Sequence, residues 1–242
     1  MGAFRFNLRL GNDEVEIRGD LPEREAPASE MVPAYLGIGE VLLKASGNAS
    51  GEEGQVPSCG PGCGACCRQL VPISRSEAAY LRRTVIPELE DAHRRRVAAR
   101  IAEAKEKLEA AGIAGDLGAL PSEPDRVKRQ NLGLRYFFLG IACPFLEEDS
   151  CSIHPRRPLA CREYLVSSPP ACCAAPTAGS IVPIVPKVKP SAALIRTDRH
   201  TTGTEGWTPM ITALTSTGIP EERQVTDPEA ELGFFLSQLG RD

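Results

Sequence analysis

Nine cysteines, placed in two groups, constrain this chain more than any other feature. The first group is the run Cys59-Gly-Pro-Gly-Cys63-Gly-Ala-Cys66-Cys67-Arg68, in which three glycines separate the thiols. Two or three residues between thiols allow a short turn to bring both sulfurs to one metal ion. The glycines permit positive φ, so that backbone N–H groups can point at thiolate sulfur, and Pro61 stiffens the first turn. This spacing predicts a cysteine-ligated metal site.

The second group of cysteines lies far downstream and also stands beside prolines and arginines. Eight or nine thiols suit two four-cysteine sites, or one site together with a set of redox thiols. The alternative, inert buried cysteines, does not explain why thiols gather at glycine and proline turns. His154, three residues after a cysteine, is an additional candidate ligand. The candidate metal ligands are Cys59, Cys63, Cys66, Cys67, Cys143, Cys151, Cys161, Cys172 and Cys173.

These residues resemble the YkgJ-like, or CxxCxxCC, family of bacterial cysteine-cluster proteins, which are described as zinc- or iron-chelating domains and often labelled iron-sulfur proteins. The resemblance covers residues 59 to about 173. It departs from the family pattern where three residues separate Cys59 from Cys63, and where His154 replaces the expected tyrosine. The matching positions are Cys59, Cys63, Cys66, Cys67, Arg68, Cys143-Pro-Phe-Leu, Cys151 with Ile153, Arg157-Pro158 and Cys161-Arg162.

Thiolate ligands concentrate negative charge, which nearby cations must offset. Four thiolates around Zn²⁺ or a [4Fe-4S]²⁺ cluster leave a net charge of about −2 per site. Arg68, Arg157 and Arg162 stand next to or near candidate ligands. We expect these three arginines to surround the metal centre and compensate its charge; the alternative for each is an ordinary surface salt bridge.

The identity of the metal does not follow from spacing alone. Cys143-Pro144 and the glycine-rich first loop are similar to ferredoxin loops, whereas short knuckles with glycine are typical of structural zinc. The family resemblance favours an iron-sulfur cluster over zinc. The C-x3-C-x2-C spacing over 59–66 is also that of radical S-adenosylmethionine enzymes. However, Ala65 stands where those enzymes usually carry an aromatic residue, and too little βα alternation follows. Flagellin lysine N-methylases, with a similar cysteine cluster, keep methyl transfer among the alternatives.

Two classes of function therefore compete. The first is a redox or cluster-dependent enzyme, an oxidoreductase or a methyl-transfer-related protein, that works with a protein or redox partner. The second is a structural zinc module that binds a partner protein and performs no chemistry. No nucleophile elbow or phosphate loop is present in the sequence, and no residue is assigned a catalytic role.

Composition limits the partners and the compartment. The net charge of −4 and the pI near 5.6 argue against nucleic-acid binding. The amino terminus lacks the continuous apolar stretch of a signal peptide, and no later run is long enough to span a bilayer. We therefore expect a cytoplasmic protein without a membrane segment, in which thiols stay reduced and bind metal.

The expected fold is α+β, a small irregular metal-organised domain with several helices and a short N-terminal hairpin. From Phe4 to Leu10, apolar and polar residues alternate with the period of a half-buried strand. Val15 to Ile17 are expected to form the paired strand after a turn at Gly11-Asn12-Asp13. Three divisions of the chain are expected. Residues 1–50 form the hairpin and a helix over 29–45, and residues 51–175 form the cysteine-cluster domain with a helical insertion over about 74–112. Residues 176–242 form a proline-rich extended segment and a C-terminal helix, packed on the same domain.

Local signals place the remaining elements. Ser74 and Glu77 have capping-box spacing at the start of a helix that Pro87 stops, and a longer helix follows over about 88–111. Residues 113–130 form a polar connection, and 134–139 are expected to be a strand or buried segment leading to Cys143. A short helix opens at Thr208-Pro209 and a terminal one at Asp227-Pro228. Trp207, the single tryptophan, lies in a Gly- and Thr-rich segment over 201–218 that is a candidate substrate or partner surface.

Overall fold

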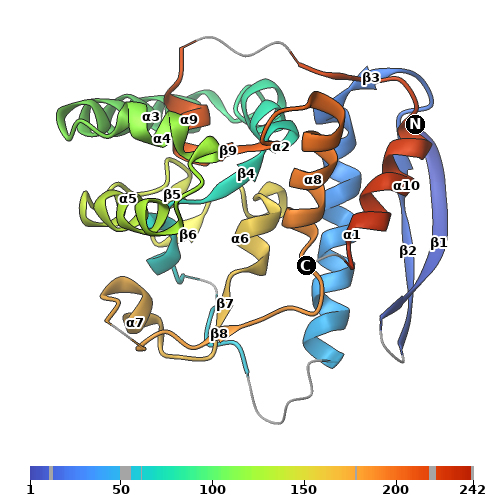
Figure 1. Ribbon diagram of the computed structural model, residues 1–242, viewed down its shortest axis with the longest axis horizontal. Coiled ribbons are helices and arrows are strands. Elements are labelled where there is room, and N and C mark those ends of the chain that lie inside the picture. Colours follow the sequence, from blue (N-terminus) through green and yellow to red (C-terminus); the bar gives the residue numbers. More distant parts are fainter. Residues whose placement is uncertain (11–12, 50–55, 61, 178, 218–221, 241–242) are drawn as a thin grey trace.

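A computed structural model gives the arrangement of the chain. It describes residues 1–10, 13–49, 56–60, 62–177, 179–217 and 222–240. Helices dominate, and the strands within these ranges form two-stranded antiparallel sheets, which confirms the α+β class (Figure 1). Across the same residues, no helix is both long and apolar enough to cross a bilayer.

The predicted N-terminal hairpin is confirmed. Strand β1 (Gly2–Leu10) pairs with β2 (Asp13–Leu21), with Phe6 opposite Ile17. Alternate side chains of the hairpin pack on the core, as the period of two predicts. Of the expected turn, Gly11 and Asn12 lie outside the described residues.

Helix α1 (Ala28–Ala49) is the element around which the main core forms, and it confirms the helix expected over 29–45. Four of its fully buried residues recur at steps of four and three, which places them on one face: Met31, Tyr35, Ile38 and Leu42. Figure 1 shows α8 (Pro190–Thr202) beside α1, with α10 (Pro228–Gln238) and the hairpin on the outer side. The short strands β3 (Ala26–Pro27) and β10 (Gln224–Val225) pair next to the start of α1.

The helices after the first cysteine group also follow their sequence signals. Ser74 and Glu77 form the expected reciprocal capping box at the start of α2 (Arg75–Tyr80), which continues into a π-helical turn over Leu81–Val85. Helix α3 (Asp91–Ala110) buries one stripe, and Gly112 ends it with a φ of +64°.

Two expectations for the segment before Cys143 are wrong. The polar connection over 113–130 contains α4 (Ala114–Ala119) and the start of α5 (Arg126–Phe138). The strand or buried segment over 134–139 is the second half of α5, and Phe138 at its end is 78% exposed. The reason is that Asp125 caps the helix by accepting from two backbone N–H groups, and the inward face needs only Leu132 and Tyr136, one turn apart.

In the C-terminal region, the structure confirms some of the predicted elements and differs from others. Strand β8 (Pro183–Ile184) pairs with β7 (Leu165–Val166), in line with the expected extended chain. Pro190, however, opens α8, because proline is well tolerated at the first helical position. Helices α9 (Met210–Thr215) and α10 begin where Thr208-Pro209 and Asp227-Pro228 predict. Strand β9 (Trp207–Pro209) pairs with β4 (Pro72–Ser74).

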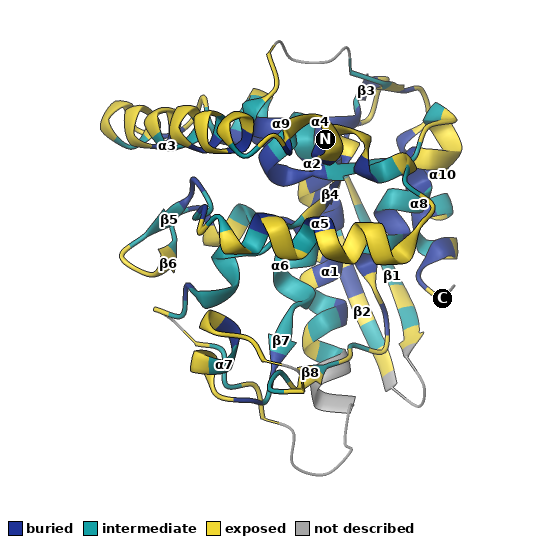
Figure 2. Ribbon diagram, turned by 60° about the vertical axis from the view of Figure 1, so that its left-hand side comes forward, coloured by how far each residue is buried: buried dark blue, intermediate teal, exposed yellow. Residues whose placement is uncertain are grey.

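Two hydrophobic clusters meet where the cysteines lie. The larger one surrounds α1, and the smaller one joins α3, α4, α5 and α9. The chain passes from one to the other at Leu70 and Val71, just after the first cysteine group, and again between Ile141 and Phe145, on either side of Cys143. Much of α3 and α5 is exposed (Figure 2). Cys143, and the end of the first cysteine group at Cys67, therefore lie close to the border between two packed regions.

Candidate metal centre

The first cysteine group lies on a tight loop that ends in a single 3-10 turn, Ala65–Arg68. Gly62 has a φ of +81°, as expected for a glycine in a ligand loop. Backbone bonds from Cys63 N–H to the Gly60 carbonyl and from Cys67 N–H to the Gly64 carbonyl, each 3.1 Å, close successive turns. Pro61, expected to stiffen this loop, lies outside the described residues.

Gly64 holds the loop against the second group through close packing. A Cβ at this position would lie 2.7 Å from Leu146 Cδ1 and 3.1 Å from both the Cα and the carbonyl oxygen of Asp149. Leu146 and Asp149 belong to the hairpin of β5 (Leu146–Glu147) and β6 (Ser150–Cys151), which ends at Cys151. A glycine at 64 is therefore what allows the two cysteine-bearing loops to touch.

A backbone hydrogen bond joins the two groups directly. Cys143 N–H donates to the Cys67 carbonyl at 2.7 Å, although the two residues are 76 positions apart in sequence. Further on, Ser58 N–H donates to the Val166 carbonyl at 2.8 Å, which ties the start of the first loop to the segment before Cys172. Helix α7 (Pro170–Ala174), which carries Cys172 and Cys173, packs on the 3-10 turn of Cys66 and Cys67.

Cys161 is positioned by a buried carboxylate. It lies on α6 (Leu159–Glu163), whose first backbone N–H, that of Leu159, donates to Glu77 Oε1 at 2.8 Å. The other oxygen of Glu77 accepts from Ser74 N–H at 2.9 Å, so that one carboxylate fixes the starts of both α2 and α6. Burial raises the pKa of Glu77 to about 7, although the N–H groups of Leu159 and Ser74 oppose the shift.

Five cysteines form what we call the inner group: Cys66, Cys67, Cys143, Cys151 and Cys161. Burial raises the pKa of Cys143 to about 12, and the neighbouring Cys151 and Cys66 raise it further. Burial likewise raises the pKa of Cys161 well above its ordinary value, and Cys143, Cys151 and Cys66 act in the same direction. Each of these thiols is thus close enough to the others to disfavour a second negative charge.

Four cysteines form the outer group: Cys59, Cys63, Cys172 and Cys173. Burial raises the pKa of Cys173, and Cys59, Cys66 and Cys63 add to the shift. Tyr164, whose hydroxyl accepts from Gln69 Nε2 at 3.3 Å, has a pKa raised by burial and by Cys173, Cys66 and Cys59. Cys66 therefore faces both groups.

The adjacent thiols Cys66 and Cys67 share one hydrogen bond. That bond lowers the pKa of Cys66 to about 6, with further help from a backbone N–H and from Arg157, while it raises the pKa of Cys67. In the metal-free protein, Cys66 is thus the thiolate and Cys67 its proton donor. Cys66 is the cysteine best prepared to meet a metal ion.

The three predicted arginines occupy different places around these thiols. Arg157 lowers the pKa of both Cys66 and Cys151, and its Nε is buried without a hydrogen-bond partner in the described structure. Arg162, whose side chain is 9% exposed, donates to the carbonyls of Pro155 at 2.6 Å and Arg157 at 3.0 Å and pairs with Glu40 at 3.2 Å. Arg68 donates to the Gly64 carbonyl at 3.1 Å, within its own turn.

The two histidines near the site differ in burial. His154 is exposed, at the start of the 3-10 turn His154–Arg156, and Arg157 and burial lower its pKa. His93, on α3, is half-buried, and its Nε2 lies 2.9 Å from Ser152 Oγ, beside Cys151. The pattern of α3 gives no signal for this contact, because it depends on the β5–β6 hairpin far along the chain.

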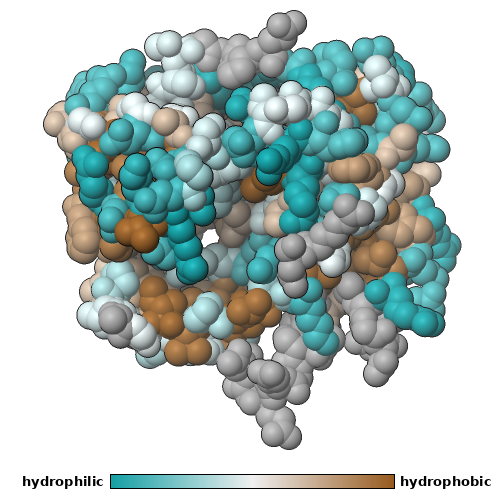
Figure 3. All heavy atoms as spheres, viewed as in Figure 1, coloured by the Kyte–Doolittle hydropathy of each residue, from teal (hydrophilic) through white to brown (hydrophobic). Residues whose placement is uncertain are grey.

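The donor chemistry of the cysteines fits a metal centre. All nine cysteines are free. Within the described ranges, no three His, Cys, Asp or Glu side chains stand at ligand spacing around one point. The unpartnered Nε of Arg157 beside Cys66 and Cys151 is what a thiolate centre would satisfy. Figure 3 shows a hollow left of the centre of this face, in the region where Figure 1 places β6 and α6.

Comparison with known proteins gives one family. A family model described as "CxxCxxCC: Putative zinc- or iron-chelating domain" matches residues 58–173. The resemblance stated from the cysteine pattern is confirmed over this stretch. Neither a curated protein nor a solved structure gives a significant match to the chain.

Proposed function

We propose that residues 58–173 hold a cysteine-ligated metal centre, an iron-sulfur cluster in preference to zinc, and that this centre has a redox role. The observation that carries the proposal is the position of Arg157, whose Nε is buried without a hydrogen-bond partner in the described structure and whose charge acts on two thiols from separate segments, Cys66 and Cys151. The family match supports a zinc- or iron-chelating domain, and the preference for iron-sulfur rests on the resemblance in the cysteine pattern.

The grouping of the thiols suggests how ligands would be divided. Four inner cysteines, Cys67, Cys143, Cys151 and Cys161, would hold one centre, and the outer group would hold a second. Cys66 lies between them and would bridge or exchange between the two. A bound cluster would supply one-electron redox chemistry.

Proton release accompanies binding at the inner group. Because burial raises the pKa of Cys143, Cys151 and Cys161, these thiols are neutral without metal and must lose protons to become ligands. Arg157 favours the thiolates of Cys66 and Cys151, and Arg162 holds the carbonyl of Arg157 in place. Both arginines therefore favour the loaded state, and Arg162→Ala is expected to weaken metal retention.

The surroundings of the inner group suit a redox centre. Phe145, Ile153 and Leu159 are buried beside the inner cysteines and exclude water, which tunes a reduction potential. A cavity of about 290 Å³ reaches Cys143 between Arg100 and Lys107. Glu103 also lines this opening and pairs with Lys107 at 2.7 Å, so both signs of charge are present where we place the approach of a redox partner. Nine reduced thiols imply a cytoplasmic setting, which is part of the proposal.

Metal analysis tests the proposal. Protein purified without air is analysed for iron, zinc and acid-labile sulfide, and its visible spectrum is recorded before and after dithionite. We expect iron and sulfide together with visible absorption that dithionite bleaches reversibly. Zinc without sulfide, in a colourless protein, would overturn the redox role while leaving the cysteine site intact.

A second candidate is the structural zinc module that binds a partner protein. It is favoured by one observation: Val127, Leu134 and Phe138 on α5 are 61%, 52% and 78% exposed. Their spacing of seven and four places them on one face of the helix that leads to Cys143. If the protein contains zinc alone, Phe138→Ser should abolish partner capture without altering zinc content, with Arg135→Ser on the same helix as the control.

A further inference from the structure

A cavity of about 450 Å³ lies between α2 and the β9–α9 segment, and none of the described residues lining it is a cysteine. Trp207, the only tryptophan of the chain, forms part of its wall. This size is within the range of sites for small organic molecules, about 300–1,000 Å³. The cavity is separate from the proposed metal centre and requires its own explanation.

One wall of the cavity is a helix face with a cation at each end. Four residues of this wall lie on one side of α2 and of the turn that follows, because they are spaced three, one and three positions apart in the sequence. They are Arg75, Ala78, Ala79 and Arg82. Seven residues of helix span about 10 Å. The two alanines leave the space between the arginines open.

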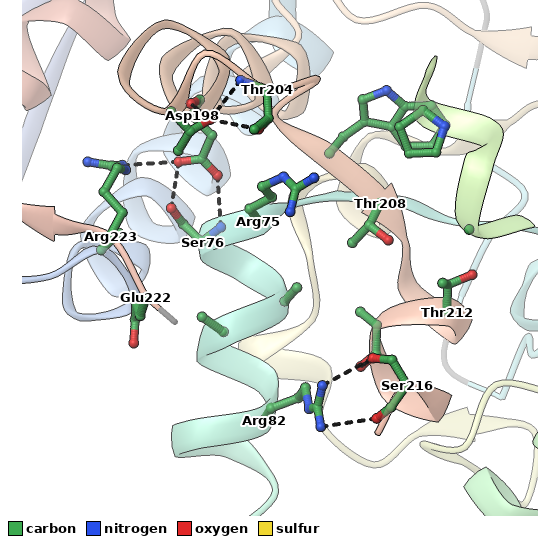
Figure 4. A pocket seen from close by; sticks show the side chains of 18 residues that line it. Arg75, Ser76, Arg82, Asp198, Thr204, Thr208, Thr212, Ser216, Glu222 and Arg223 are labelled. Atoms are coloured by element: carbon green, nitrogen blue, oxygen red, sulfur yellow. Dashed lines mark hydrogen bonds and ion pairs between the residues drawn. The ribbon is translucent and has the colours of Figure 1, made fainter. Parts of the chain in front are cut away.

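The opposite wall is a row of hydroxyl groups. It carries a hydroxyl every four residues, at Thr208 in β9, at Thr212 in α9 and at Ser216 just after α9. Figure 4 shows Arg82 reaching across to Ser216, and Arg75 lying between Asp198 and Thr208. The Oγ1 atom of Thr212 is buried and has no hydrogen-bond partner in the described structure. The cavity thus offers two guanidinium groups, from Arg75 and Arg82, across from the hydroxyl-bearing wall.

Each acidic side chain of the cavity has a cationic partner of its own, although Arg223, the partner of Asp198, is shared with Glu231. Asp198 accepts from Ser76 Oγ at 2.6 Å and from Arg223 Nη2 at 3.1 Å. Glu222 accepts from Ser29 N–H and pairs with Arg83 at 3.2 Å. Neither carboxylate is directed to the arginines of the helix wall.

Arg75 and Arg82 have no acidic partner among the described residues. Arg82 donates only to neutral acceptors, the Ser216 hydroxyl at 3.2 Å and the Ser216 carbonyl at 3.3 Å. Arg75 is exposed at the other end of the same face. Two arginines at the ends of one cavity, neither in an ion pair with a described residue, favour a ligand with an acidic group at each end.

We propose that this cavity binds a small organic dianion. One acidic group, a carboxylate or a phosphate, pairs with Arg75 and the other with Arg82. The body of the ligand lies along Ala78 and Ala79 and contacts Trp207, and its polar substituents meet the hydroxyl row. Binding requires no metal, so this site stands independently of the proposed metal centre.

Calorimetric titration tests the proposal, with Trp207 fluorescence as a readout local to the site. The probes are the dicarboxylates from succinate to suberate, fructose 1,6-bisphosphate as an organic bisphosphate, and butyrate and putrescine as a monoanion and a dication. We expect saturable binding of at least one dianion, at least tenfold weaker binding of butyrate, and none of putrescine. Preference for a dicarboxylate or for the bisphosphate identifies the acidic group.

Charge-neutralising variants assign the site. Arg75→Gln and Arg82→Gln should each weaken binding of the best dianion by about tenfold or more, since each loses a charge-assisted pair. Arg126→Gln, an exposed arginine on α5, serves as the control and should bind normally. Metal content and circular dichroism of the variants report folding separately. Failure of every dianion to bind, or unchanged binding in both cavity variants, would overturn the proposal.

Discussion

At the scale of single residues, Glu77 connects the capping of α2 to the placement of Cys161. Both of its oxygens accept from backbone N–H groups, and a glutamine has only one such acceptor. Glu77→Gln should therefore lower the free energy of unfolding of the metal-free protein by about 1–3 kcal/mol, because one buried N–H loses its partner. Urea denaturation measures this. Glu88→Gln, in an exposed pair with Arg156, is the control and should cost less than about 1 kcal/mol.

The same carboxyl gives a pH dependence of defined sign. Folding raises the pKa of Glu77 from its ordinary value of 4.5 to about 7, so its contribution to stability is complete below pH 4.5 and is lost as the pH rises through 7. In the Glu77→Gln variant, residue 77 does not titrate, so the variant does not lose this stability as the pH rises. The difference in unfolding free energy between wild type and variant should thus be larger at pH 5 than at pH 7.5, and a difference independent of pH would contradict the assignment.

Arg157 should control the reactivity of Cys66. The hydrogen bond from Cys67 and the charge of Arg157 both lower the pKa of the Cys66 thiol. Arg157→Gln should raise that pKa and slow the alkylation of Cys66 by iodoacetamide at pH 7 in the metal-free protein. Mass spectrometry of the modified peptide over a pH series gives the rate. An equal rate in Arg157→Gln and in the neighbouring control Arg156→Gln would show that Arg157 does not act on this thiol.

The sequence predicts which residues are candidate ligands and nearby cations, but not which residues they contact in the fold. Short spacing identifies Cys59 to Cys67 as candidate ligands, and neighbouring positions identify the arginines. Sequence does not show that Cys66 faces both groups or that Arg68 turns back to Gly64, because these contacts depend on how distant loops pack. The role of Glu77 at α6 is hidden for the same reason, although its capping box is visible.

At the scale of elements, Gly64 sets the distance between the 3-10 turn and the β5–β6 hairpin. A methyl group at this position would meet the backbone of Asp149, which cannot move aside as a side chain can. Gly64→Ala should cost about 1–3 kcal/mol in unfolding free energy and weaken metal retention. Gly60→Ala, in the same loop with open space around it, is the matched control and should change stability by less than about 0.5 kcal/mol. Similar effects of the two variants would mean that the loops do not pack closely.

Elements with strong local signals could be predicted, and those set by tertiary packing could not. The hairpin and α1 follow their periodicity, and Asp227 marks α10. The aromatic residues of α5 predict a strand or buried segment, whereas they lie on a helix and Phe138 stays exposed. Pro190 suggested extended chain but opens a helix.

At the scale of the whole molecule, the metal centre should connect segments that the sequence separates widely. The candidate ligands come from the first loop, from the β5–β6 region and from α6, and the chain crosses between the two hydrophobic clusters next to Cys67 and Cys143. A metal that binds only the folded arrangement stabilises it, and closing so long a loop adds little further entropic cost. Removal of the metal should therefore lower the unfolding midpoint of the whole chain.

The division into inner and outer groups predicts how losses of ligands combine. Cys143→Ala and Cys161→Ala both affect the inner group, so the second substitution should add little once the first has released the metal. Cys161→Ala and Cys172→Ala affect different groups. If two centres exist, the losses of unfolding free energy that they cause should add within about 0.5 kcal/mol. Denaturation with and without metal isolates the metal-dependent part, and metal content per chain reports each site. Strong coupling between Cys161 and Cys172 would instead require one shared centre, with Cys66, which faces both groups, as its link.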